Sequence, residues 1–169
     1  MGLFSRLMGK TTSAANDELA ILAPVSGELV PLEETHDPVF SGRKMGDGVA
    51  VVPTSGTVCA PVTGTVSAIF PTAHALAIAP DDANDAQVMV HIGIDTVRMN
   101  GEGFTALVAQ GDHVDAGQPL VEVDLDAVRA AGYDPTVFVV VCERADGSTV
   151  RERTAGPTSE KDPVLWLSK

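Results

Sequence analysis

The chain has 169 residues, of which 44% are hydrophobic and only 4% aromatic. This length suits a single domain, and a core with so few aromatic rings must be built mainly from valine, alanine, leucine and isoleucine, which favours β-structure. The net charge of −12 argues against nucleic acid as a partner, because phosphate backbones are bound by clustered lysine and arginine. An acidic surface favours a basic protein partner, although it serves solubility equally well.

Residues 1–18 are predicted to form a flexible tail ahead of a folded domain at 19–169. The first ten residues, MGLFSRLMGK, combine the apolar Leu3, Phe4, Leu7 and Met8 with the basic Arg6 and Lys10. This composition is typical both of an amphipathic segment that contacts an anionic membrane surface and of a frayed terminus. No apolar run reaches the roughly 18 residues of a membrane span, and the distant Cys59 and Cys142 indicate buried thiols in a reducing cytoplasm.

Short apolar runs separated by glycine and proline begin at Leu19 and predict strands. The stretch LAPVSGELV at 22–30 recurs as CAPVTGTVSAIF at 59–70, which indicates two related β-motifs that face each other. TVFVVVC at 136–142 and PVLWL at 163–167 are further expected strands. Helices should be few: Asp124 can cap a short one over LDAVRAA, and GFTALVAQG at 103–111 is predicted as another. The expected fold is an all-β antiparallel sandwich with a few helical turns.

The stretch QVMVHIGIDTV at 87–97 places a histidine on the outer face of a strand. Val88, Val90 and Ile92 alternate on one face, whereas Met89 and His91 fall on the other. This parity predicts that His91 points away from the core.

A second histidine is expected beside the first. PDDAND at 80–85 is composed of turn-forming residues, so the segments around it should form an antiparallel hairpin. A hairpin centred on this turn pairs residues whose numbers sum to 165, which sets His74 directly opposite His91, with Cβ atoms about 4.5–5.5 Å apart. The prediction depends on the register, because a slip of one residue would separate the two side chains.

Two adjacent imidazoles have three interpretations. They can supply half of a metal site, they can act as acceptor and helper in phosphoryl transfer, or they can be partly exposed structural residues. Thr72 could orient the ring of His74, and Asp95 lies just beyond His91, where it could hold a tautomer or cap a turn. His36 and His113 lie in polar turns and are expected to be solvated.

VHIGIDTV followed by NGEGF and preceded by PVTGTVSAIFPTAH resembles the glucose-family EIIA component of the bacterial phosphoenolpyruvate-dependent sugar phosphotransferase system. The resemblance extends through APVSGELV, DPVF, GDGVAV, GQPLVEVDL and PVLWLSK, which covers nearly the whole chain. It is similar to the free-standing form, because Met1 opens the family's own N-terminal tail. The resemblance implies an antiparallel β-sandwich with a duplicated hybrid motif.

The resemblance also implies a phosphotransferase activity that passes through a phosphohistidine. His91 would accept a phosphoryl group from phospho-HPr and pass it to a cysteine on the EIIB domain of a membrane EIICB sugar permease. His74 would steady the phosphoryl group, with Thr72 supporting its ring and Asp95 at the edge of the site. No cofactor would be required, and zinc binding by His74 and His91 would be non-essential.

An apolar collar for docking both partners is implied as well. Its residues are Val39, Phe40, Met45, Phe70, Met89 and Val97. The sequence departs from the family's usual pattern at Met89, where an aromatic is common, and at Ala73, where asparagine is common. These departures concern the docking surface rather than the histidines.

Two other classes of protein share parts of this sequence pattern. HIGID also resembles the H-x-x-x-D half-site of zinc peptidases of the lysostaphin type, which would use His74, His91 and Asp95 as ligands, yet the chain contains no H-x-H. GDHVDAGQPL suggests a biotinyl or lipoyl carrier, yet no lysine lies between Lys44 and Lys161 to carry the group.

Overall fold

The computed structural model describes residues 17–169. The amphipathic stretch predicted at residues 1–10 lies outside the described residues. Within the described part, no helix is long and apolar enough to cross a membrane.

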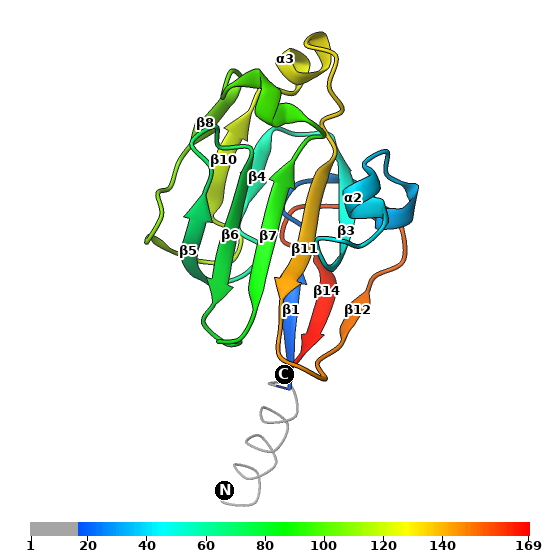
Figure 1. Cartoon of the computed structure of the whole chain (residues 1–169), viewed down its shortest axis with the longest axis vertical. Helices are drawn as coiled ribbons and strands as arrows, with labels where there is room; N and C mark the ends of the chain where they lie inside the picture. Colours follow the sequence, from blue (N-terminus) through cyan, green and yellow to red (C-terminus); the bar gives the residue numbers. More distant parts are fainter. Residues whose placement is uncertain (1–16) are drawn as a thin grey trace, which may run out of the picture.

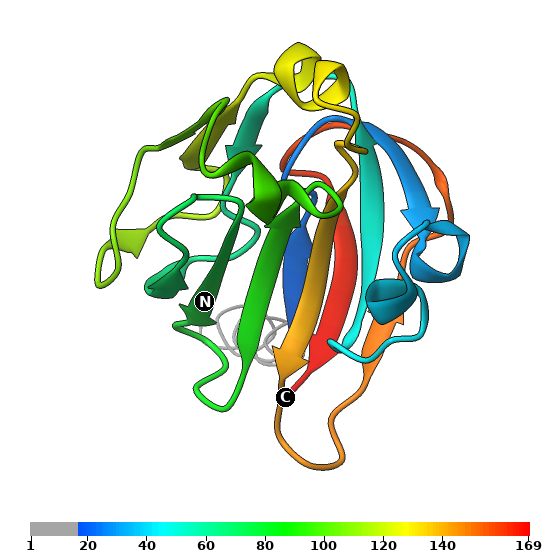
Figure 2. The same ribbon diagram turned by 45° about the horizontal axis from the view of Figure 1, so that its top comes forward.

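The described chain is a β-sandwich with very little helix, as the sequence predicted (Figure 1). One layer is an eight-stranded antiparallel sheet in the order β13-β2-β3-β11-β7-β6-β5-β9. Two three-stranded sheets, β1-β14-β12 and β4-β10-β8, make up the rest. Figure 2 shows β1 and β14 lying behind the large sheet. The main core contains side chains from all three sheets, among them Val139, Leu165 and Val121, so it lies between the layers.

The element bounds follow the short apolar runs of the sequence. In the large sheet the strands are β2 (Gly27–Pro31), β3 (Asp47–Pro53), β5 (Gly64–Ile69), β6 (Ala75–Pro80), β7 (Gln87–Ile92), β9 (His113–Val114), β11 (Val137–Glu143) and β13 (Gly156–Thr158). In the small sheets they are β1 (Glu18–Leu22), β14 (Pro163–Ser168), β12 (Val150–Glu152), β4 (Thr57–Cys59), β10 (Pro119–Val123) and β8 (Phe104–Ala106). The helical segments are η1 (Leu32–Glu34), α2 (Pro38–Ser41), η2 (Thr96–Met99) and α3 (Leu125–Ala130).

The internal repeat appears as two matching halves that bind each other. The amide of Leu22 donates to the carbonyl of Pro61 at 2.9 Å, and the amide of Cys59, which has the same place in the second copy, donates to the carbonyl of Pro24 at 2.7 Å. Because each copy supplies the donor for one bond and the acceptor for the other, the arrangement has approximate two-fold symmetry. The strands that follow, β2 and β5, each lie second from an edge of the large sheet.

The serine or threonine of each repeat has an equivalent partner. Ser26 Oγ accepts a hydrogen bond from the amide of Glu160 at 3.0 Å, and Thr63 Oγ1 accepts one from the amide of Ala116 at 2.9 Å. The glycines that follow are required by the close approach of a neighbouring strand. A Cβ at Gly64 would lie only 2.1 Å from the carbonyl oxygen of Ala79. The shared phrase A-P-V-[ST]-G is therefore a structural element of the fold.

Two expectations about local structure were wrong. The register of the β6–β7 hairpin places Ala75, not His74, opposite His91, because β6 extends to Pro80 and the turn begins one residue later than expected. Residues 103–111 are not helical: Phe104–Ala106 forms β8, which pairs with β10, so tertiary pairing overrides the local sequence. The helix capped by Asp124 is confirmed as α3, with the Asp124 carboxylate accepting from the amide of Ala127 at 3.0 Å.

A second, smaller apolar cluster covers the outer face of the large sheet. It joins Phe138 and Met89, which belong to the sheet, to Leu32 and Phe40. These last two come from residues 32–46, the connection between β2 and β3 that contains η1 and α2; we call this segment the docking loop. The docking loop therefore packs on the same face of the sheet that carries His91.

Candidate functional site

His91 lies on β7 and points away from the main core. Its neighbours Val88, Val90 and Ile92 are buried in that core, as the alternation predicted. On the outer face, the ring of Phe40 lies 5.1 Å from the His91 ring, measured between centroids. Phe138 pairs with His91 from the adjacent strand β11. The imidazole is thus held between aromatic rings on a rigid sheet.

His74 reaches the same place from an irregular segment just before β6. The turn from Phe70 to Ala73 is closed by a hydrogen bond from the Ala73 amide to the Phe70 carbonyl at 2.8 Å. Ala73 has a φ of +61°, a left-handed conformation that is uncommon for a residue with a Cβ. After this turn, the His74 ring lies 5.2 Å from the His91 ring at an interplanar angle of 85°. The two histidines are therefore neighbours despite the register that separates their backbones.

The ring nitrogens differ in their surroundings. Thr72 Oγ1 lies 2.6 Å from His74 Nδ1, so Thr72 is placed to fix the orientation of that ring. Nδ1 of His91 is buried and makes no hydrogen bond of ordinary geometry to the described residues, the backbone of Gly93 beside the ring included, whereas Nε2 is not buried in this way. Nε2 of His91 is consequently the nitrogen open to an incoming group.

An open hollow of about 300 Å³ lies over the two rings. Its lining consists of Asp37, Val39, Phe40, Met45, Phe70, His74, Ala75, Met89 and His91. A shallow apolar hollow with two imidazoles at its base suits a reacting group that is carried on another protein. No group of three or more histidine, cysteine or acidic side chains suited to a metal ion occurs in the described part of the chain.

The family profile described as "phosphoenolpyruvate-dependent sugar phosphotransferase system, EIIA 1" matches residues 19–147. The chain belongs to this EIIA family. It is 40% identical over 159 residues to the "PTS system glucose-specific EIIA component" of Bacillus anthracis, a match that covers 94% of this chain and 93% of the relative. It is also similar to the solved structure titled "glucose permease IIA from Mycoplasma capricolum", with a TM-score of 0.80, 34% identity, and coverage of 88% of this chain and 95% of that one.

Some relatives are much longer than this EIIA chain. It is 41% identical over 148 residues to the "PTS system beta-glucoside-specific EIIBCA component" of Bacillus subtilis (strain 168), where the match spans 24% of the relative. An EIIA unit therefore occurs both alone and within larger polypeptides. The antiparallel sandwich predicted from the resemblance is the fold observed.

The residues of the expected collar divide into a buried base and an exposed rim. In this EIIA chain Phe40 and Met89 are buried, so they support the site from beneath. Val39, Met45 and Phe70 are exposed by 41%, 37% and 54%, an unusual display of large apolar side chains that leaves them free to contact a partner. Val97, on η2, is also exposed but lies outside the lining of the hollow.

Two carboxylates lie close enough to influence His91. Asp95 is exposed, has a left-handed backbone, and makes no side-chain cap to η2. Asp37 lines the hollow and caps α2 by accepting from the amide of Val39 at 2.9 Å. The sequence interpretation did not include Asp37, although an aspartate directly before a proline is a signal for a helix start.

The site keeps both imidazoles neutral at pH 7. Burial lowers the pKa of His91 to about 4, and the proximity of His74 acts in the same direction. The backbone of Gly93 and the carboxylates of Asp37 and Asp95 have the opposite, smaller effect. Burial also lowers the pKa of His74. A neutral imidazole has a free lone pair, which is the form that can act as a nucleophile.

The depressed pKa of His91 should make stability depend on pH. Because the unfolded chain binds a proton at this residue near pH 6.5 and the folded chain only near pH 4, this contribution to stability is complete above pH 6.5 and is lost as pH falls toward 4. The loss reaches at most about 1.4 kcal/mol for each pH unit. The free energy of unfolding, measured with urea, should fall less between pH 7.5 and 4.5 for His91→Gln than for wild type. Parallel curves would contradict this assignment.

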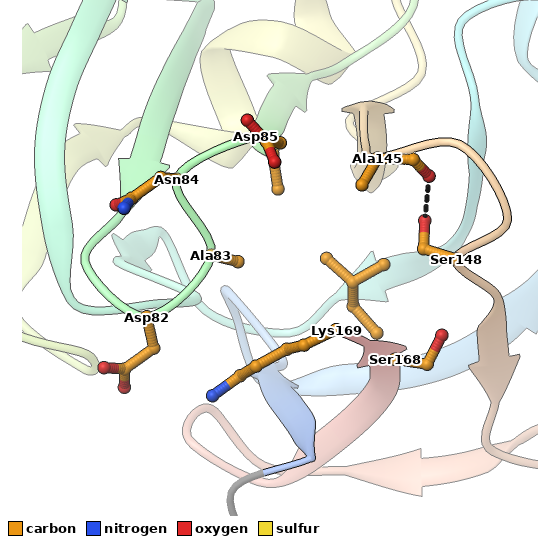
Figure 3. Close-up of a pocket in the computed structure, with 10 residues that line it drawn as sticks. Asp82, Ala83, Asn84, Asp85, Ala145, Ser148, Ser168 and Lys169 are labelled. Atoms are coloured by element: carbon orange, nitrogen blue, oxygen red, sulfur yellow. Dashed lines mark hydrogen bonds between the residues drawn. The ribbon is translucent and has the colours of Figure 1, made fainter.

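A different cavity of about 240 Å³ lies beside the start of β7, at the opposite end of the strand from His91 (Figure 3). It is bordered by the β6–β7 turn, residues 82–86, by Ala145 and Ser148, and by the C-terminal Leu167, Ser168 and Lys169. Its polar side-chain groups are carboxylates, hydroxyls, one amide and one amine. The hydroxyl of Ser148 already donates to the carbonyl of Ala145 at 2.6 Å. This cavity contains no imidazole, so the chemistry belongs to the hollow over His74 and His91.

Proposed function

We propose that the protein is a phosphocarrier of a sugar phosphotransferase system, in which His91 accepts a phosphoryl group from phospho-HPr and passes it to a cysteine of an EIIB domain. The observation that carries the proposal is the pair of neutral imidazoles 5.2 Å apart beneath an open apolar hollow, in a chain of the EIIA family. The hollow brings together the predicted His74, His91, Val39, Phe40, Met45, Phe70 and Met89, whereas the predicted Asp95 and Val97 do not line it.

In the first transfer, the lone pair of His91 Nε2 attacks the phosphorus atom of phospho-HPr. A new N–P bond forms at His91 while the N–P bond on HPr breaks, and the electron pair of that bond stays on the HPr imidazole. The proton of His91 remains on Nδ1, so no base is needed to prepare the nucleophile. Such an in-line transfer depends mainly on position and on stabilising the charge of the equatorial oxygens.

We propose that His74 supplies part of that stabilisation. If the Thr72 hydroxyl donates to His74 Nδ1, the proton of that ring lies on Nε2, which can donate to a phosphoryl oxygen on His91. One donor ring and a partner's cations make a weak phosphate site. Weak binding suits a carrier, because the phosphoryl group must leave again when the EIIB thiolate attacks phosphorus and the bond to His91 breaks.

The exposed rim of Val39, Met45 and Phe70 supports docking by successive partners. A small apolar patch in an acidic protein suits a transient interface, below about 1,200 Å², with a partner that brings positive charge. HPr and EIIB would bind the same face in turn, since each must reach Nε2 of His91. The protein would then act in the cytoplasm, next to a membrane permease.

The rival assignment to a zinc peptidase receives less support. Asp95 is absent from the lining of the hollow, and two imidazoles alone offer half of a tetrahedral site. Zinc can bind such a pair without taking part in transfer.

The proposal is tested by incubating the protein with radiolabelled phosphoenolpyruvate, Enzyme I and HPr. We expect an acid-labile, base-stable label on the protein that requires both added proteins and is unchanged by exhaustive chelation. Absence of label would overturn the phosphocarrier proposal, and activity lost with chelator and restored by zinc would favour the metalloenzyme.

We further propose that residues 1–18 bring the protein to the membrane that holds the permease. The apolar residues at the start of the chain, with Arg6 and Lys10, suit an anionic lipid surface. Deletion of residues 1–16, which leaves β1 and its pairing with β14 intact, should leave transfer from HPr unchanged and slow transfer to EIIB in vesicles, since only the local concentration changes. Circular dichroism tests the mechanism: the full chain should gain helix on addition of anionic vesicles, and no gain would contradict it.

A further inference from the structure

We infer that Arg43 is a positioning residue that holds the docking loop, residues 32–46, in the conformation that partners recognise. The inference rests on the proposed phosphocarrier function, because it concerns the surface on which the phosphoryl donor docks. Arg43 itself does not line the hollow over His91.

The docking loop has little regular structure of its own. Its only α-helical segment, α2, has four residues, which is too short to be stable without tertiary contacts. Leu32 and Phe40 anchor the loop through the outer apolar cluster. The exposed Val39 and Met45 have no comparable anchor, so their positions depend on how the loop backbone is fixed.

Arg43 fixes this backbone by binding three carboxylates with one guanidinium. Its Nε donates to Glu33 at 2.6 Å, its Nη1 donates to Asp47 at 3.0 Å, and its Nη2 donates to both carboxylate oxygens of Glu152 at 3.1 Å. Glu33 lies at the start of the docking loop, Asp47 opens β3, and Glu152 lies on β12. The side chain therefore joins both ends of the loop to two strands of different sheets.

The backbone of Arg43 is itself adapted to this role. It has a φ of +57°, which is unfavourable for a residue with a Cβ and persists only where surrounding contacts enforce it. Its amide donates to the carbonyl of Phe40 at 3.0 Å, so the turn that ends α2 is the same one that presents the guanidinium. Phe40 in turn contacts the ring of His91.

A planar guanidinium is required for this set of contacts. Its N–H groups point in several fixed directions, whereas a lysine ammonium is a point charge that satisfies one carboxylate well. Without Arg43, the carboxylates of Glu33, Asp47 and Glu152 would repel one another. Among the described residues, Arg144, which donates to Asp47 at 3.2 Å, would be the one cation still paired with them. The parts of the loop between its apolar anchors, Leu32 and Phe40, and β3 would then lose their fixed conformation.

The test uses Arg43→Met, which keeps an apolar stem of similar length, and Arg151→Met as the matched control. Arg151 pairs with Glu18 at 3.3 Å on the small sheet and lies over Trp166, so its loss removes the same charge without touching the docking loop. We expect the KM for phospho-HPr to rise about tenfold in Arg43→Met, equivalent to about 1.4 kcal/mol, with kcat within about twofold of wild type. Arg151→Met should resemble wild type.

The direction in which the KM for phospho-HPr changes distinguishes a positioning role of Arg43 from a long-range electrostatic effect of its charge. Removing a positive charge makes the protein more acidic, which by itself would favour a basic partner and lower the KM. A lowered or unchanged KM in Arg43→Met would therefore overturn the inference. Arg43→Lys restores the charge without the planar fork, so its KM should remain raised; full restoration to the wild-type value would show that charge alone suffices and would also overturn it.

Hydrogen exchange provides a measurement that does not depend on phosphoryl transfer. The amides of Ser41 and Lys44, which donate to Asp37 and Val39 within the docking loop, should exchange faster in Arg43→Met than in wild type, while amides of β7 are unchanged. Unchanged exchange at Ser41 and Lys44 would refute the positioning role even if transfer occurs. Faster exchange in a protein that accepts no phosphoryl group would uphold the role of Arg43 in the loop and refute the proposed function.

Discussion

Transfer of the phosphoryl group from phospho-HPr is expected to fall by at least about 10⁴-fold when His91 is replaced by alanine, because the acceptor nitrogen is removed. No other described histidine can substitute. The ring of His74 is oriented through Nδ1 by Thr72, and in the proposed mechanism its remaining nitrogen donates a hydrogen bond instead of acting as the nucleophile. The measurement is transfer of label in the presence of Enzyme I and HPr, followed by peptide mapping of the wild-type label under alkaline conditions.

His113, which lies outside the site and outside the docking loop, serves as a control for this experiment. It is exposed and paired with Asp81 at 2.7 Å. His113→Ala should accept label at the wild-type rate. Wild-type labelling of a folded His91→Ala protein, or a label mapped to another residue, would contradict the assignment of His91.

The second large effect on phosphoryl transfer is expected for substitution of His74. It should slow the transfer to EIIB and leave acceptance from phospho-HPr in place. His74→Gln should still accept from phospho-HPr but pass the group to EIIB about 10²- to 10³-fold more slowly. A glutamine amide can donate a hydrogen bond, but it lacks the contact with Thr72 that orients the imidazole. Attack by a thiolate anion brings a further negative charge to the phosphoryl group, so the second transfer depends on a well-oriented donor more than the first.

The two half-reactions should be measured separately. Acceptance is followed with phospho-HPr in a single turnover, and donation with pre-labelled protein mixed with an isolated EIIB domain. Thr72→Val, which leaves the His74 ring without its hydroxyl partner, should give a smaller defect in the same half-reaction. Complete loss of acceptance in His74→Gln would contradict this division between the two histidines.

The sequence was informative where side-chain alternation decides the structure. Val88, Val90 and Ile92 must face the main core, so the outward position of His91 followed directly. The internal repeat likewise indicated two facing β-motifs, because its proline, glycine and hydroxyl residues each meet a fixed steric or hydrogen-bonding demand. Both features could be predicted because they depend on side chains close together in the sequence, and both copies of the repeat have the same requirements.

The geometry around His74 could not be predicted in the same way. The pair was expected from a regular hairpin, but the hairpin is shifted by one residue and the left-handed Ala73 precedes His74. Alanine gives no sign of a positive φ, in contrast to glycine or asparagine. Phe138 was also missed as a neighbour of His91, because VFVVVC is buried on both faces and shows no alternation that would single out one residue.

The two ends of the described chain meet at one point on the molecule. The amide of Lys169 donates to the carbonyl of Asp17 at 3.0 Å, and Lys169 borders the cavity beside the turn that leads into β7 (Figures 1 and 3). His91 lies toward the opposite end of that strand. A polypeptide attached at either end would thus leave the histidines uncovered, which makes the unit readily transplantable between proteins. This architecture allows one unit to occur as a separate protein or as part of a longer polypeptide, without any change to the face that carries the histidines.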